Sequence, residues 1–499
     1  MSRRQVWYSA SGLLLFLLAC YFPLFLHLDS LSLRLWDEAR RGVNAWTMVQ
    51  EGHWLVPHFL DTPDNWGTKP PLLIWLQAFF LKVLDAPELA IRLPSALAGL
   101  ATALLLAWAG RRIFAHSFTG YFSALVLLTS TVYFDAHGAV AGDYDALLTL
   151  WLTGHLVAFL LFVQERQYRW LYISGICMLL AGWTKGIAAF FFLPGLLLFL
   201  LTDPALRPIL KDKRLYLTAV AAGIGIISYY LIRESLFPGY LQLVWDNEMG
   251  GRYFEAREGH GWGWGYYFRQ IHKYQLFFPW QYFLPLGFWL LIRTEATRRC
   301  GKFLLISTLL FLLVISAAAT KLRWYILPLI PVLSMVVGVA LDRLLTGLLR
   351  GLKHPRGIAR LGIIGFFLLA VFAFPYISVV NKVYHARHSG PERERMLYRD
   401  FFRQLPPDTS FVTLLPAYNG HFTFYQQYFN EKGYNISATY LELPDPQVQA
   451  GADTVTIFPD GALVAYCEKK AADFLKSQYQ TESMYSWESC RLLQIKTKN

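Results

Sequence analysis

Charged side chains are scarce in this sequence. Asp, Glu, Lys and Arg make up 16% of the 499 residues, whereas hydrophobic residues make up 55%. Because soluble proteins carry about 25% charged residues, this composition is typical of a polytopic membrane protein. The net charge is +12, but the basic residues concentrate in the short loops expected on the cytoplasmic side. This distribution follows the positive-inside rule and argues against nucleic acid as a partner.

Cysteine is also sparse, and its five residues show no metal-binding spacing. Cys20 and Cys177 lie in apolar segments and Cys300 lies in a basic loop, so we interpret all three as inert. Cys467 and Cys490 fall on the side of the membrane predicted to be oxidising, and a disulfide between them is left open. The sequence contains no P-loop, Rossmann glycine fingerprint, zinc ligand set or Ser-His-Asp order. None of the enzyme classes that these motifs mark is therefore indicated.

Long apolar runs dominate instead, and eleven of them are predicted to cross the membrane. The first run lacks a small-x-small exit and is interpreted as a retained anchor rather than a cleaved signal peptide. With the N-terminus inside, an odd number of crossings places the C-terminal part outside. The predicted spans are 7–28, 93–110, 117–134, 145–163, 170–183, 186–202, 215–233, 274–293, 303–319, 324–341 and 361–380.

The remaining segments are too polar to cross a membrane. Residues 40–60 mix apolar and polar residues at helical spacing and predict a helix at the outer interface. From residue 381 onward, β-like runs alternate with helical ones, which predicts a small α/β domain. We therefore predict a polytopic α-helical membrane domain, 1–380, and a soluble outer α/β domain, 381–499. The β-like runs are Ser410–Leu415, Thr454–Phe458 and Cys490–Lys496, and the helical ones are Phe422–Phe429 and Glu468–Gln478.

Two charged clusters follow the first span closely. The segment W-D-E-A-R-R-G begins at Trp36, and T-K-P-P-L-L-I-W-L-Q begins at Thr68. Lys69 stands beside the unpaired amides of a helix that opens with two prolines, and this arrangement favours an anion. Asp37 has two interpretations at this point: a catalytic carboxylate, or an N-cap of the helix that follows it.

These two motifs, followed by R-L-P-S-A-L from Arg92, resemble the first outer loop of the GT-C glycosyltransferases that use lipid-linked sugars. That superfamily includes the protein O-mannosyltransferases and the bacterial aminoarabinose–lipid A (ArnT-like) transferases. A second region, from Asn247 to Trp280, resembles the loop that binds the donor phosphate in that family. The T-K-G at Thr184 and the A-T-K-L-R-W-Y-I-L-P at Ala319 resemble further family motifs. The resemblance covers the membrane part of the chain.

The resemblance implies an enzyme in which an acceptor hydroxyl attacks the anomeric carbon of a polyprenyl phosphate sugar. Such a reaction needs a carboxylate to take the hydroxyl proton and cations to stabilise the leaving phosphate. Asp37 is the predicted general base. The predicted phosphate ligands are Lys69, Arg252, His260, Lys321 and Lys185, and the predicted substrate-orienting residues are Glu38, Arg40, Asp143, Asp145, Tyr266 and Tyr325.

Asp143-Tyr144-Asp145 also matches the D-x-D pattern that holds a metal in soluble glycosyltransferases. We expect these carboxylates to orient an acceptor or an arginine, and a divalent metal on one or both is left open. No cofactor is expected to be required, and the protein is expected to act as a monomer in the bacterial inner membrane with its active site facing the periplasm.

Two other functions are retained as alternatives. One is a protein O-glycosyltransferase of the same fold, and the other is a transporter or flippase for a lipid-linked glycan. A transporter should carry ionisable residues near span midpoints and an internal repeat. Here His155 is nearly the only ionisable residue so placed and the sequence shows no repeat, which counts against a transporter. The sugar, the acceptor and the anomeric outcome are not determined by the sequence.

Overall fold

The computed structural model describes residues 3–114, 118–256, 259–353, 355–441 and 458–496. The chain divides into two compact units. The helical unit contains residues 1–28, 69–73 and 92–385. The α/β unit contains residues 29–68, 74–91 and 386–499. The predicted domain boundary at residue 380 stays a prediction, and the contacts add two segments of the first outer loop to the C-terminal part.

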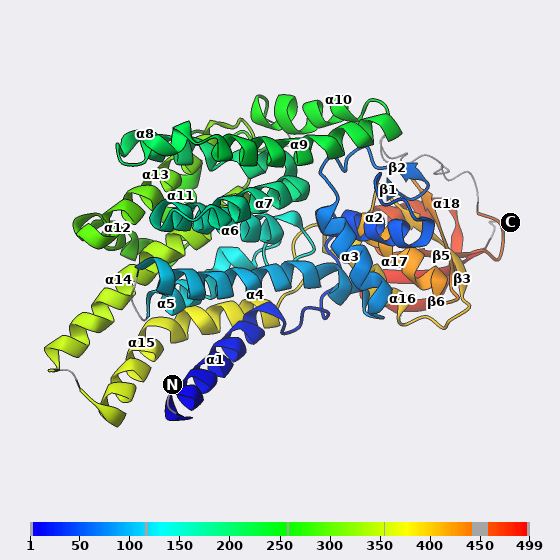
Figure 1. The fold of residues 1–499 in the computed structure, drawn as a ribbon. Helices are drawn as coiled ribbons and strands as arrows, with labels where there is room; N and C mark the ends of the chain where they lie inside the picture. The colour runs from blue at the N-terminus through cyan, green and yellow to red at the C-terminus, as the bar shows by residue number, and fades with distance from the viewer. Residues whose placement is uncertain (1–2, 115–117, 257–258, 354, 442–457, 497–499) are drawn as a thin grey trace. The chain divides into compact units, whose positions relative to one another are not determined.

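The helical unit is built from long apolar helices joined by short turns (Figure 1). Short 3-10 turns precede or follow several helices, including Gly186–Phe190 after α7 and Arg323–Leu329 before α14, and a π-turn covers Trp245–Tyr253. The helices are α1 (Arg3–Leu24), α4 (Pro87–Phe114), α5 (Thr119–Leu128), α6 (Tyr144–Glu165), α7 (Tyr168–Lys185), α8 (Leu193–Thr202), α9 (Lys213–Leu236), α10 (Tyr240–Val244), α11 (Tyr266–His272), α12 (Leu284–Arg293), α13 (Glu295–Ala317), α14 (Ile330–Gly351) and α15 (Gly357–Tyr384).

Within the residues that the structure describes, seven helical segments are long and apolar enough to cross a membrane. Shorter apolar helices, among them Gly12–Leu24, Thr119–Leu128 and Leu193–Thr202, accompany them. The predicted polytopic helical membrane protein is therefore confirmed, whereas the predicted count of eleven crossings stays a prediction. The seven segments are Pro87–Phe114, Tyr144–Glu165, Tyr168–Phe190, Lys213–Leu236, Glu295–Ala317, Arg323–Gly351 and Gly357–Tyr384.

Small residues allow helices α4 and α5 to approach closely. A Cβ atom at Gly120 would lie 2.2 Å from the carbonyl oxygen of Ala107, and one at Gly110 would lie 2.4 Å from the Cα of Gly120. A larger side chain at either glycine would therefore push the two helices apart. Close backbone approach through small residues is a common way to pack membrane helices, because apolar burial does not drive their association in lipid.

The α/β unit contains a five-stranded sheet in the order β4-β3-β5-β7-β6. β3 pairs in parallel with β4 and β5, and β7 pairs antiparallel with β5 and β6. The strands are β3 (Ser410–Leu415), β4 (Asn435–Tyr440), β5 (Leu463–Tyr466), β6 (Gln480–Trp487) and β7 (Cys490–Lys496), and the helices are α2 (Asp37–Glu51), α3 (Leu72–Val83), α16 (Tyr398–Phe402), α17 (Gly420–Glu431) and α18 (Lys469–Gln478).

The predicted α/β domain is confirmed, and two of its strands have the predicted bounds. β3 covers Ser410–Leu415 and β7 covers Cys490–Lys496. The predicted strand Thr454–Phe458 lies outside the described residues except for Phe458. A disulfide joins Cys467 and Cys490, 23 positions apart, and decides the question that the sequence leaves open.

One of the hydrophobic clusters of the α/β unit links the first outer loop to the C-terminal sheet. Leu33, Val43 and Met48 from the first outer loop share this cluster with Phe422 and Tyr425 of α17. A short hairpin of β1 (His58–Phe59) and β2 (Thr62–Pro63) follows α2. The segment predicted to lie at the membrane interface therefore forms a helix, α2, that packs into the α/β unit.

Candidate active site

Helix α2 presents one accessible carboxylate at its first turn. Asp37 and Glu38 lie in this turn, where the positive end of the helix dipole stabilises acidic side chains. Glu38 is only 3% exposed, and its Oε2 accepts the backbone N–H of Arg34 at 2.8 Å. The side chain of Asp37 is 38% exposed. Asp37 is therefore the carboxylate of the pair that a substrate can reach.

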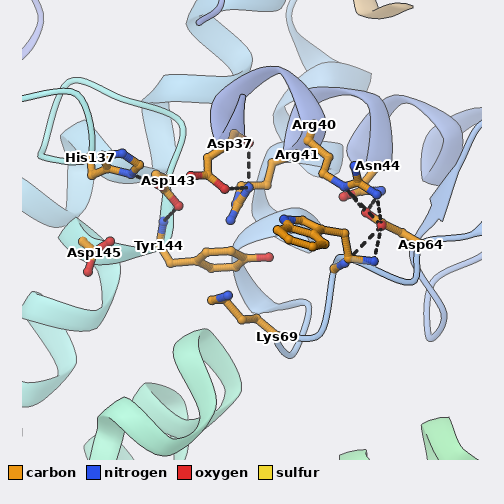
Figure 2. Close-up of polar contacts among 12 residues, drawn as sticks. Asp37, Arg40, Arg41, Asn44, Asp64, Lys69, His137, Asp143, Tyr144 and Asp145 are labelled. Atoms are coloured by element: carbon orange, nitrogen blue, oxygen red, sulfur yellow. Dashed lines mark hydrogen bonds and ion pairs between the residues drawn. The ribbon is translucent and has the colours of Figure 1, made fainter. Parts of the chain in front are cut away.

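A salt bridge along the helix fixes the orientation of Asp37. Its Oδ1 accepts a hydrogen bond from Nη1 of Arg41 at 2.9 Å, and the same nitrogen donates to the Asp37 carbonyl at 2.7 Å (Figure 2). Trp36 occupies the N-cap position of α2, so Asp37 is the first helical residue. The interpretation of Asp37 as the N-cap is therefore wrong for this helix.

A buried carboxylate, Asp64, holds the first turns of α2 to the hairpin that follows it (Figure 2). Nε of Arg40 donates to Asp64 Oδ2 at 3.0 Å, and Nη2 of Arg40 also donates to its Oδ1. Nδ2 of Asn44 donates to Oδ2 at 3.0 Å. The backbone N–H groups of Trp66 and Gly67 donate to Oδ1 at 2.9 and 3.0 Å. Asp64 thus fixes both α2 and the loop that leads directly to Thr68 and Lys69.

The surroundings of Asp64 and Arg40 stabilise the charges of this ion pair. Burial alone would raise the pKa of Asp64, but the Arg40 charge and the hydrogen bonds from Arg40, Asn44 and Gly67 lower it from 3.8 to about 2. The Arg40 guanidinium lies 4.8 Å from the ring centroid of Phe59 and 5.9 Å from that of Tyr418. Such cation–π contacts are stronger in desolvated sites. Arg40, predicted to orient substrate, therefore lies inside the α/β unit with only 6% of its surface exposed.

In the helical unit, Lys69 lies in an ion pair. Its Nζ is 2.9 Å from Oε1 of Glu248 and 6.0 Å from the ring centroid of Tyr144. The two prolines after Lys69 lead into α3, which begins at Leu72. Proline suits the start of a helix because it lacks a backbone N–H, and an N–H in the first turn has no partner within the helix. Glu248 holds the ammonium group in place, and a phosphate would have to compete with this carboxylate for it.

A second lysine of the helical unit is paired in the same way. Nζ of Lys185, at the end of α7, lies 2.6 and 2.7 Å from the two carboxylate oxygens of Asp145 at the start of α6. The same ammonium lies 5.4 Å from the ring centroid of Tyr325. Arg252 is within hydrogen-bonding reach of the Tyr325 hydroxyl. The structure therefore brings together four predicted site residues, Lys185, Asp145, Tyr325 and Arg252.

Backbone hydrogen bonds align the remaining predicted phosphate ligands. The N–H of Thr320 donates to the Arg252 carbonyl at 3.0 Å, and the N–H of Lys321 donates to the His260 carbonyl at 3.1 Å. Lys321 is 4% exposed. The ring of Tyr266 stacks on that of Trp262, with centroids 5.7 Å apart. The ladder links the Arg252–His260 loop to the segment that carries Lys321.

Asp143 caps helix α6 and contacts a histidine. Its Oδ1 accepts the N–H of Tyr144 at 2.7 Å, and its Oδ2 lies against Nδ1 of His137 (Figure 2). The His137 ring stacks on Trp324, with centroids 3.6 Å apart. A carboxylate and an imidazole are suitable ligands for a divalent cation. Asp145, in contrast, is held by Lys185, which competes with a cation for the same oxygens.

Three residues of this region were missed by the sequence reasoning. Asp64 stands in D-N-W-G, where an aspartate that accepts N–H groups two and three residues later is typical of a tight turn. That signal predicts a turn but not the contact with Arg40. Glu248 lies in the Asn247–Trp280 region and Tyr144 lies within the D-x-D pattern, but neither was assigned a role. Their contacts with Lys69 depend on tertiary structure.

Comparison with known proteins shows which proteins this chain resembles. The family described as dolichyl-phosphate-mannose-protein mannosyltransferase matches residues 68–233. A relative from Aeromonas salmonicida, an undecaprenyl phosphate-alpha-4-amino-4-deoxy-L-arabinose arabinosyl transferase, is 27% identical over 406 residues, which are 75% of this chain and 68% of the relative. A protein of the same name from Yersinia pestis is 28% identical over 337 residues, 64% of this chain and 58% of that protein.

Solved structures of similar proteins identify the fold of this chain. ArnT from Cupriavidus metallidurans, bound to undecaprenyl phosphate, superposes with a TM-score of 0.72 at 18% identity and covers 97% of this chain and 98% of its own. The chain has the GT-C fold of the ArnT-like glycosyltransferases. The archaeal oligosaccharyltransferase AglB from Archaeoglobus fulgidus gives a TM-score of 0.52 at 15% identity, over 83% of this chain and 63% of AglB. The predicted superfamily and fold class of this GT-C chain are therefore confirmed.

Proposed function

We propose that this chain transfers a sugar from a polyprenyl phosphate to a lipid or glycan acceptor at the outer face of the bacterial inner membrane. The observation that carries the proposal is Asp37, an exposed and oriented carboxylate on a chain with the ArnT-like fold. The donor class rests on the names of the relatives and on the undecaprenyl phosphate bound to the Cupriavidus protein.

In the proposed reaction, Asp37 takes the proton of an acceptor hydroxyl as its oxygen attacks the anomeric carbon. The bond between that carbon and the phosphate oxygen breaks, and polyprenyl phosphate leaves with both bonding electrons. An aspartate has a reference pKa of about 3.9, so proton transfer must be concerted with a late attack. The ion pair with Arg41 holds the carboxylate in one orientation, which suits a base of this kind.

The cations of the helical unit are proposed to stabilise the leaving phosphate. Lys69, Arg252 and Lys185 are the strongest candidates because each lies in or beside a polar cluster with Tyr144 or Tyr325. His260 and Lys321 are proposed to complete the phosphate site. Glu248 and Asp145 are proposed to hold Lys69 and Lys185 in place before the donor arrives. Charge-assisted contacts of this kind are the stronger class of hydrogen bond.

We further propose that the reaction requires no cofactor and that the protein acts as a monomer. The free energy for transfer is stored in the donor bond, so neither ATP nor a nucleotide sugar is needed on the outer face. A protein acceptor is the second candidate, and the match of residues 68–233 to a family of protein mannosyltransferases favours it.

The test uses purified protein in nanodiscs with synthetic undecaprenyl phosphate aminoarabinose. A lipid A acceptor and an acceptor peptide are supplied in separate reactions, without ATP. We expect release of free undecaprenyl phosphate and a mass increase of one sugar on the lipid acceptor. A mass increase on the peptide alone would assign the second candidate. Donor that stays intact with every acceptor, while intact donor crosses the bilayer of proteoliposomes, would show a flippase and contradict the proposal.

Orientation is tested separately in intact cells. Cysteines placed at the exposed positions Asp61 and Lys470 should react with an impermeant thiol reagent, and one at Lys211 should not. Labelling at residue 211 would reverse the orientation, and the outer-face acceptor would then be wrong.

A further inference from the structure

A groove opens on the surface of the helical unit, away from the polar clusters that surround Lys69 and Lys185. Its volume is about 430 Å³, and it is formed by helices α1, α4 and α5. Apolar and aromatic side chains line most of it, and two arginines at the end of α4 complete it. The lining residues are Leu13, Phe16, Leu104, Ala107, Trp108, Arg111, Arg112 and Tyr121.

Several of the apolar side chains in the groove face outward. Leu13 is 48% exposed, Trp108 43% and Tyr121 37%. Helix α4 is one of the segments long and apolar enough to cross a membrane, so we expect hydrocarbon beside the apolar part of the groove. A hollow between membrane helices that contains no protein atoms must be filled by lipid, because water in an apolar hollow lacks hydrogen-bond partners. An acyl chain is therefore the expected content of the apolar part.

The arginines give the groove a positive end. Arg112 is paired with Glu165 at 2.8 Å, which balances its charge. Arg111 makes no hydrogen bond or ion pair with any residue in the described part of the chain. One positive charge thus remains unbalanced at the end of an apolar groove. Trp108 and Tyr121 are residue types that gather at the level of the lipid headgroups.

We propose that this groove binds one anionic phospholipid, with its phosphate at Arg111 and Arg112 and an acyl chain along Leu104, Ala107 and Leu13. Basic pockets between membrane helices bind anionic headgroups in this manner. The inference concerns a lipid distinct in place and role from the sugar donor, and it does not depend on the proposed transfer reaction.

The test is native mass spectrometry of the full-length protein in detergent, titrated with dioleoylphosphatidylglycerol or dioleoylphosphatidylcholine. We expect one phosphatidylglycerol adduct to form at lower concentration than the phosphatidylcholine adduct. Arg111→Gln should reduce the preference for phosphatidylglycerol roughly five-fold, the effect of one basic residue near an anionic surface. Ala107→Phe fills the apolar part and should weaken adducts of both lipids.

Matched controls separate this site from a general effect of charge. The double variant Arg207→Gln and Arg298→Gln removes two exposed arginines elsewhere in the helical unit, each of which donates to a backbone carbonyl. This double variant should keep the lipid preference of the unchanged protein. Equal affinity for the two lipids, an unchanged preference in Arg111→Gln, or an equal loss in the control variant would overturn the proposal. Glycerol phosphate binding as tightly as phosphatidylglycerol would also overturn it, because the site would then be a free-anion site.

Discussion

The contacts of Asp64 predict that Asp64→Asn loosens the first outer loop. Asp64 has no exposed side-chain surface, and the Arg40 side chain is only 8% exposed. The amide that replaces the carboxylate has nearly the same shape but carries no charge, and one of its two sites becomes a donor. The guanidinium of Arg40 is then left buried without its counter-charge, and two backbone N–H groups lose part of their acceptor.

The expected loss of local stability is about 3 kcal/mol. Removal of one partner from a buried ion pair costs about 3–5 kcal/mol. The pKa of Asp64, lowered from 3.8 to about 2, gives a second figure, because one pKa unit corresponds to about 1.36 kcal/mol and the shift to about 2 kcal/mol. The second figure is smaller because the pKa shift compares the ionised carboxylate with the protonated acid. The protonated acid still has one oxygen that is free to accept hydrogen bonds.

Hydrogen exchange measures this loss where it occurs. Amides of α2 and of the β1–β2 hairpin should exchange roughly 100-fold faster in Asp64→Asn, the factor for about 3 kcal/mol. Asp61→Asn, at an exposed position of the same hairpin, is the matched control and should leave exchange unchanged. In the unchanged protein, this stabilisation should be complete above pH 3.8 and should be lost as the pH falls toward 2, because the folded state lowers the pKa. Equal protection of α2 in the two variants would show that the Asp64 carboxylate does not stabilise this loop.

Three further predictions concern the cations, the metal and the disulfide. Lys69→Ala and Arg252→Ala should raise the KM for the donor more than the KM for the acceptor, and equal effects in steady-state kinetics would point to a structural role. EDTA should change turnover by less than two-fold, because Lys185 already occupies both oxygens of Asp145 and those of Asp143 contact the Tyr144 N–H and His137. Complete loss with recovery in Mg²⁺ or Zn²⁺ would show that a metal is required. Replacement of Cys467 and Cys490 by serine should lower the unfolding free energy of the α/β unit by about 3 kcal/mol, from the loop of 23 residues that the disulfide closes. Denaturant unfolding followed by hydrogen exchange of β5 and β7 measures this change, and an unaltered midpoint would contradict it.

The membrane fold could be predicted because its signals are local. Hydrophobic runs and the positions of arginine determine which segments cross the membrane, and alternating apolar residues determine strands such as β3 and β7. The motifs around Asp37 and Lys69 pointed to the superfamily because their order and spacing are unusual. The number of crossings was harder to predict. Helices such as α5 and α8 are apolar but shorter than the segments long enough to cross, so their sequences do not show whether they cross.

The contacts of the site were harder to predict because they join residues far apart in sequence. Nothing near Lys69 in the sequence indicates that its carboxylate partner is Glu248, 179 positions away. Likewise, Lys185 and Asp145 are 40 positions apart. The sequence of α2 predicts an amphipathic helix but not what its apolar face packs against, because an amphipathic pattern fits both a lipid surface and a protein core. Only the contact between α2 and α17 distinguishes them.

The most direct test of the account is the single-turnover rate of polyprenyl phosphate release by Asp37→Asn under saturating donor and acceptor. Glu38→Gln, one residue away on the buried side of α2, is the comparison variant, and donor binding is measured in parallel. We expect Asp37→Asn to bind the donor normally but to release polyprenyl phosphate about 100- to 10,000-fold more slowly, the range for loss of a general base. Release at a rate near that of the unchanged protein would contradict the role of Asp37 and with it the proposed mechanism.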